Sequence, residues 1–175
     1  MLVDYRHLAS DLGRDWRTIK KYNDLLEYSL LTKKVYQYSG NFLTSEKKLK
    51  KYYPSITSLS FALFPEKLER EDFLGKLAEV LVINQSQGKF FWRFNTNEVD
   101  LVLEKGNQKT ILPVEIKYRA KISEKDIAGL LTFCQKFSVP EALVITRDFE
   151  KVERRRRATL KFLPLWRFLL ESENN

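Results

Sequence analysis

The pattern of apolar and polar positions predicts two helices and a strand at the start of the chain. Apolar residues recur at helical spacing from Tyr5 to Leu12 and again from Trp16 to Tyr28. The segment from Leu30 to Tyr38 has the pattern of a strand, and Ser39-Gly40-Asn41 that of a hairpin tip. This order predicts an N-terminal winged helix-turn-helix over residues 1–62. Such domains usually have a further helix first, so we expect the chain to begin inside a larger protein.

The pattern after residue 62 predicts an α/β (α+β) domain over residues 63–175. Pro65 marks its start, because proline suits the first turn of a helix. Apolar residues between Pro54 and Pro65, which include Phe61 and Phe64, are expected to pack between the two domains. The predicted order is helix, three strands, helix and strand in a mixed sheet: Glu66 to Ser86, Lys89 to Asn95, Val99 to Leu103, Thr110 to Lys117, Ser123 to Phe137, and Ala142 to Thr146.

The second and third strands of this domain carry a pair of carboxylates. Glu115 and Lys117 are two residues apart, so their side chains leave the same face of a strand. A tight turn at Gly106-Asn107-Gln108 would set Asp100 opposite Glu115, with Cβ atoms about 4.5–5.5 Å apart. Two carboxylates that close need a cation between them, a shared proton or full solvation. Pro113 cannot donate a ladder hydrogen bond, which predicts a bulge or a sheet edge there.

Composition limits the chemistry that these carboxylates can support. The chain has 175 residues and a formal net charge of +8, which favours a polyanionic partner. With His7 and Cys134 as its only histidine and cysteine, a zinc site is excluded, and oxygen ligands point to Mg²⁺ or Mn²⁺. The sequence has no phosphate-binding P-loop, so we expect no nucleotide site. No apolar run is long enough to span a membrane, and the single cysteine fits a reducing cytoplasm.

The ordered set Glu79, Asp100, Glu115 and Lys117 resembles the PD-(D/E)xK nucleases of the restriction-endonuclease-like superfamily. This resemblance implies that the three carboxylates and the Ile116 carbonyl hold the metal. It also implies that Lys117 lowers the pKa of the attacking water or stabilises the pentacovalent phosphate. DNA would be the substrate, as for junction resolvases and repair exonucleases, and junction resolution would require a homodimer.

Two segments resemble a narrower group, the C-terminal region of DUF4143-type bacterial and archaeal ATPases. They are Glu98-Val99-Asp100-Leu101-Val102 and Pro113-Val114-Glu115-Ile116-Lys117. In that group an AAA-type ATPase precedes a winged helix and a nuclease-like domain. The resemblance therefore implies an ATPase partner, either upstream in the same chain or as a separate protein.

Basic residues outside this set are candidates for DNA binding. The second helix presents Arg17, Lys20 and Lys21, either as a recognition helix would or as a solvated face of a domain that joins two others. Residues Arg154, Arg155, Arg156 and Arg157 form a run that either contacts phosphate or is a solvated link. Lysines 47, 48, 50 and 51 form a basic cluster, which is more often a solvated surface than a site.

Three functions fit these patterns. The first is a metal-dependent DNA endonuclease or exonuclease. The second is a catalytically silent nuclease-like module that binds DNA or protein for an ATPase. In the third, Asp100, Glu115 and Lys117 form a cross-strand salt-bridge patch that needs no metal.

Overall fold

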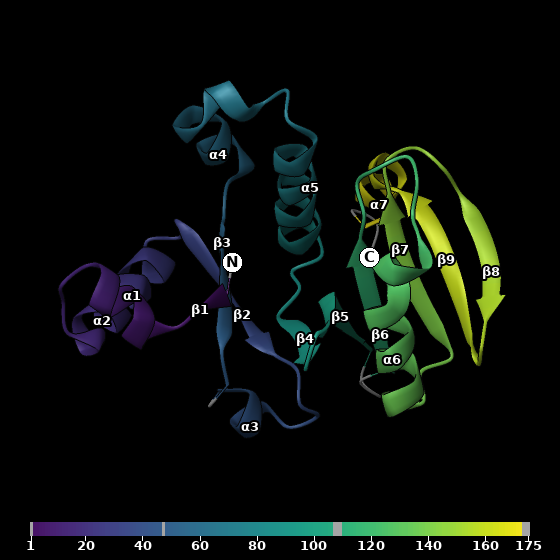
Figure 1. The fold of residues 1–175 in the computed structure, drawn as a ribbon, viewed down its shortest axis with the longest axis horizontal. Coiled ribbons are helices and arrows are strands. Elements are labelled where there is room, and N and C mark those ends of the chain that lie inside the picture. The colour runs from purple at the N-terminus through teal and green to yellow at the C-terminus, as the bar shows by residue number, and fades with distance from the viewer. Residues whose placement is uncertain (1, 47, 107–109, 173–175) are drawn as a thin grey trace.

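The computed structural model describes residues 2–46, 48–106 and 110–172 (Figure 1). In this part of the chain, nine strands form one mixed sheet in the order β1-β3-β2-β4-β5-β6-β7-β9-β8. The strands are β1 (Leu2–Val3), β2 (Thr32–Gln37), β3 (Lys50–Pro54), β4 (Phe90–Phe94), β5 (Asn97–Lys105), β6 (Thr110–Ile116), β7 (Glu141–Thr146), β8 (Lys151–Arg155) and β9 (Ala158–Pro164).

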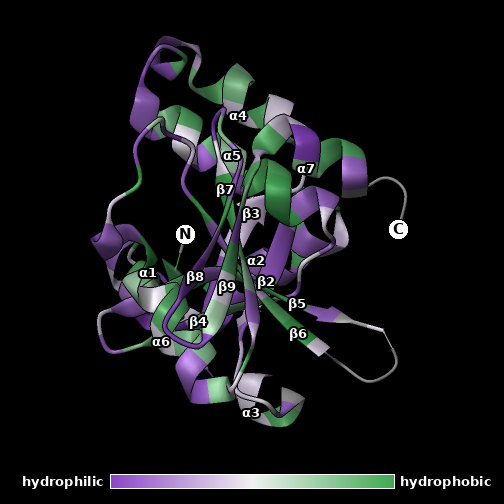
Figure 2. Ribbon diagram, turned by 90° about the vertical axis from the view of Figure 1, so that its right-hand side faces the viewer, coloured by the Kyte–Doolittle hydropathy of each residue, from purple (hydrophilic) through white to green (hydrophobic). Residues whose placement is uncertain are grey.

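Helices lie on both faces of this sheet. They are α1 (Tyr5–Asp11), α2 (Trp16–Tyr28), α3 (Phe42–Glu46), α4 (Thr57–Leu63), α5 (Glu71–Gln85), α6 (Ala128–Phe137) and α7 (Leu165–Ser172), with short 3-10 helices η1 (Pro65–Lys67) and η2 (Glu124–Ile127). One buried core joins α6 to β4, β5, β7 and β9, and the other joins α5 and α7 to β5, β6 and β7. Figure 2 shows β6, an inner strand with β5 and β7 as neighbours, as a mostly hydrophobic strand.

The mixed α/β class predicted from the sequence is confirmed. The elements α5, β4, β5, β6, α6 and β7 follow one another in the predicted order of helix, three strands, helix and strand. The strands β4, β5 and β6 pair antiparallel, and β6 pairs parallel with β7. The connection from β6 to β7 passes through α6, as a parallel pair requires.

The two N-terminal helices are also confirmed, and an aspartate caps each of them. Asp4 accepts hydrogen bonds from two backbone N–H groups at the start of α1, and Asp15 accepts one from the Arg17 N–H of α2. The hairpin tip predicted at residues 39–41 is wrong. The α3 helix separates β2 from β3, because the Asn41 side chain accepts from the Leu43 N–H at 2.9 Å and starts that helix.

The N-terminal strands belong to the same sheet as the rest of the chain. β2 pairs antiparallel with β3 and parallel with β4, where Tyr36 lies opposite Phe90 and Gln37 opposite Phe91. Side chains also cross this junction, since Asn84 at the end of α5 donates to the carbonyls of Pro54 and Ser55 at 3.0 and 3.1 Å. The boundary at residue 62 stays a prediction, but the strands on its two sides are hydrogen-bonded to each other.

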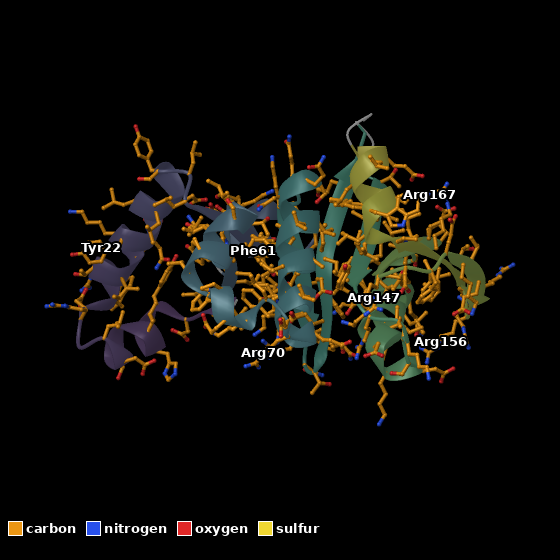
Figure 3. The ribbon with its side chains drawn as sticks, turned by 90° about the horizontal axis from the view of Figure 1, so that it is seen from above. Tyr22, Phe61, Arg70, Arg147, Arg156 and Arg167 are labelled. Carbon is orange, nitrogen blue, oxygen red and sulfur yellow. The ribbon has the colours of Figure 1, made fainter. Side chains whose placement is uncertain are left out.

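Two predictions for residues 54–86 are wrong. The single helix from Glu66 to Ser86 is divided into η1 and α5, because Arg70 has an extended backbone and its side chain pairs with Asp72 in the first turn of α5. Most apolar residues before Pro65 belong to α4, and Phe64 directly follows that helix. Phe61 and Phe64 are about two-fifths exposed rather than packed between domains. Figure 3 shows Phe61 and Arg70 between Tyr22 at one end of the molecule and Arg156 at the other.

Candidate functional site

A bulge in β5 sets the position of Asp100. Between Phe90 and Trp92, two steps along β4 match three steps along β5, from Val102 to Val99. The extra residue reverses the alternation of β5: Val99 and Val102 pack in the core beside α6, whereas Leu101 packs in the core beneath α5 and α7. The bulge therefore lies at Asp100 and Leu101, where it re-aims a side chain.

The expected bulge or edge at Pro113 is wrong, whereas the predicted register is confirmed. Pro113 pairs with Val102 in an uninterrupted β5–β6 ladder, and β6 has a neighbour on each side. Its missing N–H is tolerated because the pairing of β6 with β7 begins one residue later, at Val114. Extended by one residue, the register sets Asp100 opposite Glu115. The turn residues Asn107 and Gln108 lie outside the described part of the chain.

The ladder between β5 and β6 ends at the pair Leu101 and Val114, and the acidic site begins there. Beyond this pair, the Ile116 N–H donates to the Asp100 carboxylate at 2.8 Å instead of to a strand carbonyl. Lys117 Nζ donates to Glu115 Oε1 at 2.5 Å and lies 4.0 Å from Asp100 Oδ2. The structure thus brings together three of the four predicted residues where two strands diverge.

These three side chains are largely buried, which shifts their pKa values. Burial raises the pKa of Asp100 to about 6, with Glu79 adding to the increase and Lys117 opposing it. Burial and the neighbouring Asp100 raise the pKa of Glu115 well above its usual value. Burial alone would lower the pKa of Lys117, but the two carboxylates raise it above its usual value, so the ammonium stays charged.

Glu79 projects from α5 beside this site, and its direct partners are residues of β3. Its Oε1 accepts a hydrogen bond from the Tyr53 hydroxyl at 2.6 Å and lies 3.6 Å from Lys51 Nζ. The same ammonium lies 2.5 Å from Glu98 Oε1 of β5. Glu79 therefore acts on Asp100 through its charge and its place beside Lys51, with β3 supplying its direct partners.

Sequence reasoning missed Lys51 and Tyr53. The lysines at positions 47–51 were expected to form a solvated cluster, but the Lys51 side chain is 7% exposed, so this expectation is wrong for that residue. The available signal was the alternation of the strand, which places Lys51 and Tyr53 on one face. Nothing in the sequence showed that α5 would cover that face.

The donor set of the pair Asp100 and Glu115 fits a hard divalent cation. Both are carboxylates, and Glu115 Oε2 is buried without a hydrogen-bond partner. A buried carboxylate oxygen with no donor is the group that a cation would satisfy. Within residues 2–46, 48–106 and 110–172, no group of three or more His, Cys, Asp and Glu side chains is arranged to hold a metal ion. Glu79 therefore stands apart from the pair in this structure.

The candidate DNA-binding residues lie at opposite ends of the sheet. Arg17 stacks on Trp16 at 4.9 Å, Lys20 pairs with Asp24 at 2.9 Å, and both line a surface depression with Lys21. The arginine run covers the end of β8 and the turn to β9, and Arg155 of β8 pairs with Glu153 and Glu124. Figure 3 shows Tyr22 of α2 and Arg156 near opposite ends of the molecule.

The raised pKa of Asp100 predicts an effect of Asp100→Asn on stability. The folded protein binds this proton more tightly than the unfolded chain, so stability falls as pH rises from about 4 to about 6. Asparagine removes this penalty and can still accept from the Ile116 N–H. We expect the metal-free variant to be more stable by ~2–3 kcal/mol near pH 7 and by little near pH 4. Urea unfolding in EDTA at both pH values measures this, and an equal gain at the two would contradict it.

Comparison with known proteins places this site in a family. Neither a curated protein nor a solved structure matches the chain. None of the helices in the described residues has the length and apolar character needed to cross a membrane. The family model for the domain of unknown function DUF4143 matches residues 74–168, a range that includes Glu79, Asp100, Glu115 and Lys117. Because this match covers more than half of the 175 residues, the chain belongs to the DUF4143 family.

Proposed function

We propose that this chain is a metal-dependent deoxyribonuclease that works beside an AAA-type ATPase. The observation that carries the proposal is the buried pair Asp100 and Glu115 with Lys117 between them, at the point where β5 and β6 diverge. The element order and the position of Glu79 on the preceding helix add support, since both match the PD-(D/E)xK nucleases that the sequence resembles. The winged-helix character of residues 1–62 is part of the same proposal.

Each residue has a chemical part in this function. Asp100 and Glu115, with the Ile116 carbonyl, would hold Mg²⁺ or Mn²⁺, and Glu79 would complete the set or orient water. A bound ion of this kind polarises the phosphodiester and lowers the pKa of water. The Lys117 ammonium stays charged, so it can stabilise negative charge that develops on the phosphate. Basic residues of α2, and those at the end of β8 and in the turn after it, would contact the DNA backbone.

The alternative proposal is a silent module that binds DNA or protein for the ATPase. It is supported by the ion pair between Lys117 and Glu115, which neutralises part of the acidic charge without a metal. In the third interpretation this ion pair is structural and has no ligand.

One experiment separates these functions. The purified chain is incubated with labelled duplex, single-stranded and four-way-junction DNA, in Mg²⁺, in Mn²⁺ and in EDTA. We expect cleavage in either metal that stops in EDTA and returns when excess Mn²⁺ is added. Salt-sensitive DNA binding without cleavage would support the silent module. The absence of both DNA binding and DNA cleavage would support the structural ion pair.

A further inference from the structure

We infer that Lys51, from the N-terminal part of the chain, is a positioning residue of the nuclease site. Its ammonium group holds Glu79 and Glu98 beside Asp100. This inference rests on the proposed function. It adds a residue that lies outside the family match at residues 74–168.

The ammonium group of Lys51 lies between two glutamates from different elements. Lys51 Nζ lies 2.5 Å from Glu98 Oε1 and 3.6 Å from Glu79 Oε1, so one cation bridges β5 and α5. It also lies 5.1 Å from the centre of the Phe91 ring, beneath which the core continues. The side chain is 7% exposed, so it is not positioned to contact DNA directly.

This bridge fixes the positions of the two elements that carry Glu79 and Asp100. Glu98 is two residues before Asp100, and only Val99 separates it from the bulge in β5. Glu79 is held from a second side by the Tyr53 hydroxyl, which comes from the same strand as Lys51. The strand β3 therefore fixes both the helix that carries Glu79 and the end of β5 that carries Asp100. Without the cation, Glu79 and Glu98 would repel each other across this junction.

A matched control exists in the same part of the chain. Lys34 of β2 is also a largely buried lysine, with a side chain 12% exposed, and it also pairs with two carboxylates. Its partners, Asp24 and Glu27, belong to α2 and lie away from Asp100. Lys34→Met therefore removes a similar ion pair, with a similar cost in stability, and leaves the nuclease site intact.

The test compares Lys51→Met and Lys34→Met in the full chain, with the DNA that the natural protein cleaves, in Mn²⁺. Rates are measured well below the melting temperature of each variant. We expect Lys51→Met to lower kcat by about 10- to 100-fold with KM for DNA nearly unchanged, because the residue supports groups at the metal and does not bind DNA. Lys34→Met should keep kcat within about 3-fold.

Equal kcat values for the two variants would overturn the role of Lys51 and leave the proposed function standing. An increase in KM with constant kcat would also overturn it, since that result indicates DNA binding instead of positioning. If Lys51→Met does not fold, Lys51→Gln replaces it and carries the same expectation. No cleavage by the natural protein would remove the proposed function and this inference together.

Discussion

Asp100→Asn is expected to slow DNA cleavage by about 100- to 1000-fold while the metal-free protein becomes more stable. The two effects have one cause. Burial makes the charged form of Asp100 unfavourable in the fold, whereas the proposed function requires that charged form to bind the metal. A residue of a site is expected to lower stability and support activity, whereas a residue of a structural ion pair would only support the fold. Single-turnover cleavage in Mn²⁺ and urea unfolding in EDTA measure the two effects.

Lys117→Met gives the complementary result. Cleavage should fall by a similar factor, but stability should also fall by ~3 kcal/mol or more, because Asp100 and Glu115 lose the cation between them. Lys161→Met is the control: Lys161 pairs with Glu141 at 2.9 Å, its side chain is 51% exposed, and neither property should change much. If Asp100→Asn is destabilised and both site variants cleave like the natural protein, the carboxylates and Lys117 form only a structural ion pair.

Gly129→Ala is expected to destabilise the protein by about 1–3 kcal/mol or more, although alanine is the better helix former. Gly129 lies in α6 against β5, and a Cβ there would meet the Glu98 carbonyl oxygen at 2.2 Å and the Glu98 nitrogen at 3.0 Å. Both are backbone atoms of a paired strand, so they cannot turn aside as a side chain would. The helix would have to move away from the strand that carries Asp100.

Gly75→Ala provides the matched comparison for this prediction. Gly75 lies inside α5, and no atom lies within 4 Å of the position that its Cβ would occupy. This variant should be stabilised by up to ~1 kcal/mol through helix propensity alone. Urea unfolding of both variants under the same conditions measures the difference. A similar shift of the two midpoints, in either direction, would show that α6 can retreat from Glu98 without cost.

The sequence was sufficient to predict that Asp100 lies opposite Glu115, because the two residues are close to one turn in the sequence. Asp100 and Glu115 are equally far from one short turn, and this symmetry set the register that the structure confirms. The bulge was predicted at the wrong place. A proline marks a position where a ladder hydrogen bond is missing, whereas the irregularity lies between β4 and β5, where two residue steps along β4 match three along β5.

Features that depend on distant segments could not be predicted from the sequence. Lys50 and Lys51 are adjacent and chemically identical, and only the cover of α5 makes one of them a buried partner of Glu79. The break before α5 contains Leu68, Glu69 and Arg70, none of which is a helix breaker. Its cause is the extended backbone of Arg70, which a helical pattern does not encode.

The pairing of β2 with β4 determines which fragments of this protein can be studied alone. Backbone bonds from the Tyr36 and Tyr38 N–H groups to the carbonyls of Lys89 and Phe91, at 2.8 and 2.6 Å, cover one side of β4. A fragment cut at the start of the family match would expose that side as an open edge. The strand there reads Phe90-Phe91-Trp92, an apolar aromatic template for pairing with other copies. We therefore expect a fragment without the first 62 residues to self-associate more readily than the full chain.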